Sequence, residues 1–527
     1  MTDLTSAPNR RRSIFGKLFS RAPIPGTQTP SVLLAVSLTL IPLALLLFNN
    51  QGSIANRQPV VEVLLGALAI SAAFAIALAR KLAPHVAASL VGAFGYGFFS
   101  LSWVPGTAGT PVLLVFWIAS SVVGAAIVVW LLSDSKLVIT LASVAASAIV
   151  VALVVLSMGG VQDQPIVAGE APDSLAFSDA LVRTPNVYVF ILDGFGRPDV
   201  LEEQFADLDL DISPSIERLN ELGFGQDASG SANYSQSILS IPSALNGELQ
   251  HLPDAPLSGL EQWEYGRPAL KGENVLVNSF RSAGYDYWHS GSAIWDATAC
   301  DPDIADLCLG LDTSDQETIS AIWSLTPVRN HVGKVAFEDF SDPPSVVDSI
   351  LVARETQPED QPYILFSHII SPHQPYRFDA DCAFRSRSAT GTTLAVGHLP
   401  EHRPLYVNQV QCLSQQLEDA MADLVAADPD ALILLQADHG SAFQVGHETL
   451  AWDDASIEER MAVFRMTRLP GECQSTDIRA QSLVNTPQLL LSCVTGDEPE
   501  WVEPQMLLLE AGSTVRENDQ ALVQPIN

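Results

Sequence analysis

Five runs of apolar residues fill the first third of the chain, and short polar segments separate them. Each run approaches the roughly 20 residues that a helix needs to cross a bilayer, and none has the polar face of a helix in a soluble bundle. Because four runs follow the first, we do not interpret the first as a cleaved signal peptide. We predict a transmembrane domain of five helices over residues 31–160, after a basic tail over residues 1–30. The runs are Ser31–Phe48, Val60–Ala79, Val86–Val104, Pro111–Leu132 and Leu137–Met158.

Basic residues predict how these spans are oriented. Up to residue 160 the chain has nine Lys and Arg against three Asp and Glu, a net charge of +6. Except for Arg57, the basic residues precede the first span or follow the second and the fourth. Cytoplasmic segments are enriched in Lys and Arg, so the amino terminus is predicted to be cytoplasmic. An odd number of spans then places everything after residue 160 on the periplasmic or extracellular side.

The remainder of the chain is strongly acidic. It holds 18 Lys and Arg and 57 Asp and Glu, a net charge of −39. Such a charge excludes nucleic acid as a partner. It also repels anionic substrates, so an anion site needs local positive charge, most simply from a metal ion.

All six cysteines lie in this acidic part. An even number of cysteines confined to an exported domain predicts disulfides. No CxxC pair occurs, which disfavours a zinc cluster. Six cysteines allow 15 connectivities, of which the simplest pairs sequence neighbours: Cys300 with Cys308, Cys382 with Cys412, and Cys473 with Cys493.

A different pattern begins at residue 186, after polar residues 161–185 that predict a linker. Residues 187–192 form a continuous apolar run, which predicts a strand buried on both faces in a parallel sheet covered by helices. Asp193 follows the run directly. In open α/β sheets ligands bind beyond the carboxyl ends of the strands, so Asp193 is a candidate metal ligand. The alternative is an ordinary polar residue that ends a strand.

The same plan recurs near the end of the chain. Residues 431–437 predict a second buried strand, and Asp438-His439-Gly440 follows it. Adjacent Asp and His side chains supply an oxygen and a nitrogen ligand suited to Zn²⁺ or Mn²⁺. His447 is close enough in sequence to reach the same place, although a surface position is equally consistent with the pattern.

Two further segments carry candidate chemistry. A strand over residues 363–366 precedes a loop with His368 and His373, and prolines on both sides of His373 restrict that loop. Five serines crowd residues 231–250, where an apolar helical pattern begins. A serine at the start of that helix would hold a phosphate beside free backbone N–H groups, and a serine-rich helix cap is the alternative. Helices are also expected over residues 197–222 and 405–425.

The four segments NVYVFILDGFGR, SQSILSIPSALNG, SPHQPYRF and LLQADHGSAF occur in this order. In this they resemble the alkaline phosphatase superfamily, in its sulfatase-like branch, over about residues 186–496. Five spans before such a domain are also similar to lipoteichoic acid synthases and lipid A phosphoethanolamine transferases. Those families move a phosphorylated head group from a phospholipid to an acceptor outside the cytoplasmic membrane.

The resemblance implies an extracytoplasmic α/β domain over residues 186–500, with a mostly parallel sheet between helices and a tail over residues 501–527. It also implies one divalent metal ion, Zn²⁺ or Mn²⁺ before Mg²⁺ or Ca²⁺. The implied ligands are Asp193, Ser237, Asp438 and His439.

Two spacings favour Ser237 over Ser235 and Ser240 as the nucleophile. The phosphoethanolamine transferases have Thr-x-x-Ser-x-Pro from their nucleophile, and residues 237–242 fit this pattern with serine for threonine. Sulfatases place their modified residue ten positions before a glycine, and Gly247 is ten after Ser237.

One departure from the sulfatases concerns substrate chemistry. Conversion to formylglycine needs Pro two and Arg four residues after the modified position, where this chain has Leu239 and Ile241. Sulfate ester hydrolysis by that route is therefore disfavoured.

These observations lead to one functional hypothesis. Ser237 attacks the phosphorus of a membrane phospholipid and passes the head group to a cell-envelope glycan or lipid, while His373 holds phosphate oxygens or protonates the leaving group. His447 is a weaker candidate for the same role. The nearest alternative is a sulfatase-like hydrolase of phosphate or sulfate esters. A non-catalytic envelope glycan-binding protein is a second, and a transporter a third, which the near absence of charged residues in the spans disfavours.

Overall fold

The computed structural model divides the chain into two compact units. One comprises Met1–Gln51, Arg57–Val161 and Thr318–Val332, and the other comprises the rest. The structure describes residues 27–49, 58–101, 110–132, 135–159, 181–226, 229–249, 266–291, 298–309, 322, 325–328, 342–358, 360–374, 376, 378–383, 402–443, 453–475, 477–509 and 523–525. Most of the predicted linker, and His447, lie outside these residues.

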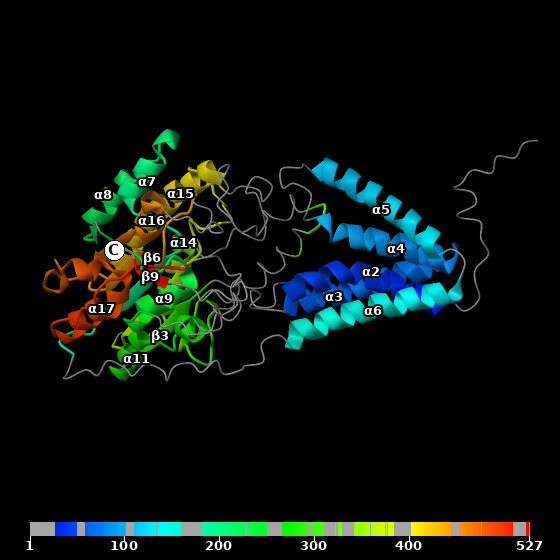
Figure 1. Cartoon of the computed structure of the whole chain (residues 1–527). Coiled ribbons are helices and arrows are strands. Elements are labelled where there is room, and N and C mark those ends of the chain that lie inside the picture. Colours follow the sequence, from blue (N-terminus) through cyan, green and yellow to red (C-terminus); the bar gives the residue numbers. More distant parts are fainter. Residues whose placement is uncertain are drawn as a thin grey trace, which may run out of the picture. The chain divides into compact units, whose positions relative to one another are not determined.

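The first unit is helical, and α2 packs against α3, α4 and α6 (Figure 1). Large apolar side chains such as Phe74 and Val115 are more than half exposed, as is expected of helices that face lipid. Four of the helices are long and apolar enough to cross a membrane. The helix at the predicted third span has only 15 residues, so a count of five spans is not confirmed. The helices are α2 (Gln28–Asn49), α3 (Gln58–Ala79), α4 (Pro84–Phe98), α5 (Thr110–Leu132) and α6 (Lys136–Gly159).

The second unit is built on a seven-stranded sheet in the order β2-β7-β6-β1-β5-β3-β4. The five strands from β6 to β4 are parallel, and β7 runs antiparallel to β6. β1 lies between β6 and β5, and all six of its residues are buried, as the apolar run predicted. The strands are β1 (Val187–Leu192), β2 (Gly225–Gln226), β3 (Asp286–Ser290), β4 (Leu307–Cys308), β5 (Tyr363–Ile369), β6 (Leu432–Ala437) and β7 (Arg465–Arg468).

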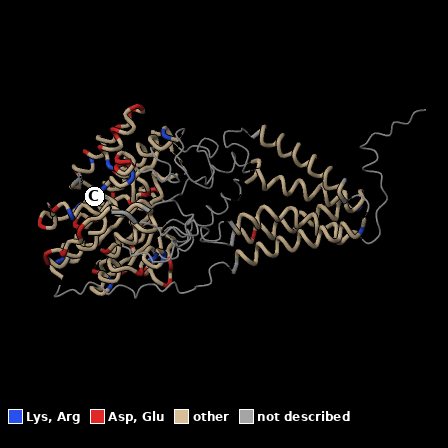
Figure 2. Tube along the Cα trace, in the orientation of Figure 1, with Lys and Arg blue, Asp and Glu red and all other residues tan. Residues whose placement is uncertain are grey.

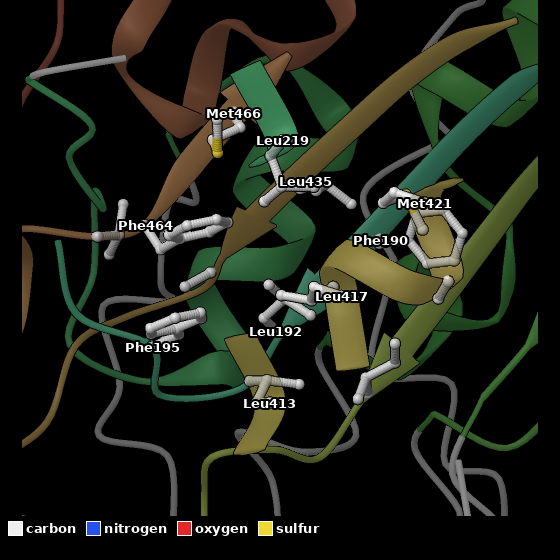
Figure 3. Packing of buried hydrophobic residues seen from close by; sticks show 14 of the residues in the cluster. Phe190, Leu192, Phe195, Leu219, Leu413, Leu417, Met421, Leu435, Phe464 and Met466 are labelled. Carbon is white, nitrogen blue, oxygen red and sulfur yellow. The ribbon is translucent and has the colours of Figure 1, made fainter. Parts of the chain in front are cut away.

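Helices cover both faces of this sheet. On one face, Phe190 and Leu192 of β1 point toward Leu417 and Met421 of α15 (Figure 3). On the other, the alternate residues of β1 pack in a cluster with α9, α11 and α17. The first face carries α7 (Pro198–Gln204), α8 (Ser213–Glu221), α14 (Pro343–Arg354), α15 (Arg403–Ala427) and the end of α16 (Asp454–Met461); the second carries α9 (Ser237–Asn246), α11 (Val275–Ser282) and α17 (Thr486–Thr495).

Short elements complete the unit. They include a small antiparallel pair of strands in the predicted C-terminal tail. These elements are η2 (Ala206–Leu208), η5 (Gly471–Cys473), η6 (Ile478–Gln481), η7 (Leu483–Asn485), β8 (Leu507–Leu509) and β9 (Val523–Pro525).

Two predicted elements were wrong in extent. The single helix expected over residues 197–222 is divided into α7, η2 and α8, because Asp209 adopts a left-handed conformation at φ +52° and Pro214 can occupy only the start of α8. The strand expected over residues 363–366 continues to Ile369. His368 therefore belongs to β5 and not to the loop after it.

The cysteine prediction is confirmed, since the three disulfides join the sequence neighbours as expected. Charged side chains occur throughout the α/β unit, whereas the long helices of the first unit carry very few (Figure 2). Both features agree with an apolar helical unit joined to an acidic, disulfide-bonded α/β domain.

Candidate metal and nucleophile site

Strand register brings two carboxylates together. Leu192, the last residue of β1, pairs with Ala437, the last residue of β6. The next residues, Asp193 and Asp438, therefore lie side by side at the carboxyl edge of the sheet. Both side chains are fully buried.

The hydrogen bonds leave these carboxylates largely unsatisfied. Oδ1 of Asp438 accepts the backbone N–H groups of Gly194 and His439, at 3.1 and 2.9 Å. Gly194 has φ +78°, a conformation that favours glycine. Among the described side chains, both carboxylate oxygens of Asp193 and Oδ2 of Asp438 accept no hydrogen bond. Buried carboxylates are normally paired or bound to a metal ion.

Two histidines approach the same pair of carboxylates. Nε2 of His439 lies 3.6 Å from Oδ1 of Asp193 and 3.4 Å from Oδ2 of Asp438. Nε2 of His368, on β5, lies 3.5 Å from Oδ2 of Asp193. Asp193, His368 and Asp438 can offer ligand atoms that all lie within 4.8 Å of one another. The histidine that the sequence assigned to a loop is therefore part of the site.

A hydrogen bond at Nδ1, the second ring nitrogen of His439, fixes the orientation of the ring. Nδ1 lies 3.1 Å from the carbonyl oxygen of Gly440, which can only accept, so Nδ1 carries the hydrogen. The lone pair of Nε2 then points toward the carboxylates, as in a metal-binding histidine whose second nitrogen is held by a backbone carbonyl.

Ser237 is the serine that reaches this cluster. It is the first residue of α9, and its Oγ lies 3.2 Å from Nε2 of His439. The hydroxyl of Ser240 instead donates to the carbonyl of Asp438, at 2.6 Å. The backbone carbonyl of Ser235 accepts a hydrogen bond from Arg460. Of the three serines considered from the sequence, Ser237 therefore places its hydroxyl next to His439 and the two carboxylates.

Burial and neighbouring charges shift the pKa values of the site residues. Burial, and then the negative charge of Asp193, raise the pKa of Asp438. Burial opposes the ionisation of Asp193, but the neighbouring histidines, His373 first and then His368 and His439, outweigh it and lower its pKa. Burial, and then the charge of Arg460, lower the pKa of His439, so its ring is neutral. Two adjacent carboxylates and the neutral imidazole of His439 form a donor set for a divalent cation.

The residues present therefore fit a metal ion. Oxygen donors come from Asp193 and Asp438, and nitrogen donors from His439 and His368. Such a mixture of oxygen and nitrogen donors suits Zn²⁺, and the Ser237 hydroxyl can take a further position of the same shell.

His373 lies beside this cluster in the loop after β5. Its backbone N–H donates to the carbonyl of Asp193, at 2.9 Å, and its Nδ1 lies 2.8 Å from the carbonyl of Gln374. Gln409 of α15 donates to the His373 carbonyl, at 3.1 Å. The loop is thus fixed from both sides, with the half-buried ring of His373 next to the carboxylates.

Two residues of the site were missed as functional residues in the sequence. His368 is an interior position of a strand that pairs with β1, and its register opposite Ile191 places it near Asp193. A histidine between the apolar run 363–366 and the apolar residues 369–370 was the available signal. Arg460 is fully buried beside the site, and a helix-terminal arginine before an apolar run gave no comparable signal.

Comparisons with known proteins give the following matches. The family model described as Sulfatase matches residues 185–463. A search of curated proteins found no match. The C-terminal periplasmic domain of EcEptC from Escherichia coli has 12% identity and a TM-score of 0.39, covering 64% of this chain and 92% of that chain. The phosphonate monoester hydrolase of Agrobacterium radiobacter has 14% identity and a TM-score of 0.39, covering 63% and 81%.

A match over a longer stretch is the lipooligosaccharide phosphoethanolamine transferase A (EptA) of Neisseria meningitidis. It has 10% identity and a TM-score of 0.36, covering 88% of this chain and 95% of that chain. The family membership rests on the Sulfatase model, whose match covers more than half of the chain.

Proposed function

Because the chain belongs to the sulfatase family, we propose that it is a membrane-anchored, metal-dependent phosphotransferase. It moves a phospholipid-derived head group to a cell-envelope glycan or lipid through a phosphoryl-serine intermediate. One observation carries the proposal: Oγ of Ser237 lies 3.2 Å from Nε2 of His439, next to two buried carboxylates whose free oxygens accept no hydrogen bond among the described residues.

Asp193, Asp438, His439 and Ser237 would hold one divalent cation, with His368 as a further ligand. Zn²⁺ and Mn²⁺ suit this donor set better than Mg²⁺ or Ca²⁺. The bound cation would lower the pKa of the Ser237 hydroxyl, as it does for bound water, and so supply a nucleophile near neutral pH.

The protein's own residues then carry out two displacements. Oγ of Ser237 gives up its proton and forms a bond to phosphorus as the bond from phosphorus to the diacylglycerol oxygen breaks, and that oxygen takes a proton. The oxygen of an acceptor hydroxyl next loses its proton and bonds to the phosphorus as the bond from phosphorus to Oγ of Ser237 breaks, and Oγ takes a proton. His373 protonates the first leaving oxygen or donates to the phosphate oxygens, and His447 is a second candidate for that role.

The apolar helices suit a lipid donor. We infer five crossings, with the amino terminus in the cytoplasm and the α/β unit in the periplasm or outside the cell. In this arrangement the helices keep Ser237 near the lipid head groups, which raises the effective concentration of the donor.

A hydrolase that transfers the same group to water is the second candidate, and the family match favours it. The serine segment disfavours a formylglycine sulfatase, because Leu239 and Ile241 stand where the converting signal would need Pro and Arg.

The test uses the full-length protein in membranes with phospholipids labelled in the head group. The wild type is expected to release diacylglycerol and to label an envelope glycan or lipid, whereas Ser237→Ala should do neither and should keep its melting temperature. Ser243→Ala is the control, since it removes a buried hydroxyl of the same helix that donates to the Glu248 carbonyl, at 2.8 Å, and should retain labelling. Label found only in a water-soluble product would favour the hydrolase, and an active Ser237→Ala variant would refute the proposal.

A further inference from the structure

Arg460 is a buried positive charge beside the proposed metal site. It lies near the end of α16, and its side chain is only 2% exposed. Burying a guanidinium is costly unless its donors are satisfied. Its partners are therefore informative about why it is there.

The guanidinium bridges the two segments that carry the site. Its Nε donates to the carbonyl of Ser235, at 2.8 Å, two residues before Ser237. Its Nη1 donates to the carbonyl of Gly440, at 2.7 Å, one residue after His439. The backbone N–H of Gly440 donates in turn to the carbonyl of Arg460, at 2.7 Å. One side chain thus joins the serine segment to the Asp-His segment.

The Gly440 carbonyl links this bridge to the metal position. It accepts from both Arg460 and Nδ1 of His439, so the arginine fixes the acceptor that sets the tautomer of His439. Glycine is required here, because a Cβ on residue 440 would lie 2.1 Å from the carbonyl oxygen of Glu459. The backbone of residue 440 therefore lies directly against α16.

The charge of Arg460 also matters to the site. Burial lowers its pKa to about 10, while Asp438 and Asp193 oppose the shift, so the guanidinium is charged at neutral pH. The adjacent acid Glu459 accepts from the Ser441 hydroxyl and the Phe443 backbone, at 2.6 Å each. The charge of Arg460 therefore also acts on the carboxylates of Asp193 and Asp438.

We propose that Arg460 is a positioning residue: by holding the carbonyls of Ser235 and Gly440 it fixes Ser237 and His439 in the geometry that binds the metal ion. The proposal rests on the metal site of the proposed function. Groups that orient a metal ligand typically change metal affinity by 10- to 100-fold when they are removed.

The experiment measures Zn²⁺ affinity of the full-length protein in detergent by competition with a chromophoric chelator. Arg460→Met is expected to weaken binding by about 10- to 100-fold and to change the visible absorption spectrum of the Co²⁺-substituted protein. Arg460→Lys keeps the charge but lacks the planar fork that reaches two carbonyls, so it should give an intermediate loss. If Arg460→Met fails to fold, Arg460→Lys carries the test.

Arg465 provides a matched control, because it is only 1% exposed and its Nη1 contacts the Ser482 carbonyl, at 3.3 Å. Arg465→Met should lower the melting temperature and leave Zn²⁺ affinity unchanged. Equal loss of Zn²⁺ affinity in the two Met variants, or wild-type affinity in Arg460→Met, would overturn the role of Arg460 and leave the proposed metal site standing. A wild-type protein without stoichiometric metal would overturn the proposed metal site as well.

Discussion

Asp193 and Asp438 are neighbours although they are 245 positions apart in the sequence, because each follows the last residue of one of two adjacent parallel strands in register. Parallel pairing places such residues at the same edge of the sheet, where α/β proteins bind ligands. The burial of both carboxylates makes the edge repulsive without a cation. The metal ion and the local fold are therefore energetically linked.

Because of this linkage, one substitution is expected to abolish metal binding without destabilising the metal-free protein. Asp438→Asn keeps an oxygen that can accept from Gly194 and His439, and it removes one buried negative charge. We expect loss of stoichiometric metal by elemental analysis and, in chelator-treated protein, equal or higher stability, by about 1 kcal/mol. Asp423→Asn, at an exposed position of α15, is the control and should change neither quantity. A less stable metal-free Asp438→Asn protein would argue that the carboxylates do not repel each other.

The second prediction concerns which histidines bind the metal. Because both His439 and His368 approach Asp193 within 3.6 Å, His439→Gln and His368→Gln should each weaken Zn²⁺ binding by at least 10-fold. The measurement is chelator competition, with the Co²⁺ absorption spectrum as a second readout. His289→Gln, which replaces a fully buried histidine of the adjacent strand β3, should bind Zn²⁺ normally. Normal affinity in His368→Gln would restrict the ligands to the set that the sequence implied.

The sequence predicted what depends on local pattern. The apolar runs before Asp193 and Asp438 indicated two buried strands, and both are present. The choice of Ser237 rested on the resemblance to the transferases and sulfatases, and its role as nucleophile stays a prediction. The sequence did not predict that His368 belongs to the site, because the apolar pattern seemed to end at Phe366 and only pairing with β1 shows that the strand continues. Contacts between strands depend on register, which no single segment encodes.

The role of Arg460 was even harder to predict from the sequence than that of His368. Its two acceptors lie on segments 20 and 225 residues away in the chain, and its role follows only from their meeting. The prediction of a single helix over residues 197–222 was wrong for a local reason. Asp209 adopts a left-handed conformation, which an aspartate tolerates but which its presence in the sequence does not predict.

A third prediction separates stability from activity. At the end of the sheet opposite the site, Arg354 donates to the hydroxyls of Tyr188 and Tyr363, at 2.8 and 3.2 Å, and pairs with Asp428. Arg354→Met leaves the buried carboxylate of Asp428 without its positive partner, although Asn186 and Tyr188 still donate to it, so it should cost about 1–3 kcal/mol of unfolding free energy. Zn²⁺ affinity and turnover of the folded protein should be unchanged.

The control for this prediction is an exposed ion pair in the same unit. Arg281 contacts Asp306 at 3.0 Å, with both side chains more than a third exposed, so Arg281→Met should cost less than about 1 kcal/mol. Thermal unfolding of both variants provides the comparison. Equal losses of unfolding free energy would show that the hydrogen bonds and the ion pair of Arg354 stabilise the protein no more than a surface ion pair does.

The fourth prediction is a pH dependence that originates at His289. Its Nε2 lies 3.0 Å from the carbonyl of Thr298, which can only accept, so Nε2 carries the hydrogen and Nδ1 accepts from the hydroxyl of Tyr287, at 2.7 Å. Burial lowers the pKa of His289 to about 4 from its ordinary value of 6.5. The unfolded chain therefore binds a proton between these two pH values while the folded protein does not. Stability from this residue is fully present above pH 6.5 and is lost as the pH falls through about 4.

The expected size of that loss is about 3 kcal/mol between pH 7 and pH 4, because one pKa unit corresponds to about 1.4 kcal/mol. His289→Gln cannot titrate in this range but can still donate to the Thr298 carbonyl. The free energy of unfolding should therefore fall less steeply with acid in the variant than in the wild type, so that the difference between them narrows toward pH 4. Other groups also titrate in this range, and subtracting the two curves removes their contribution. Parallel curves would show that His289 is not held neutral by the fold.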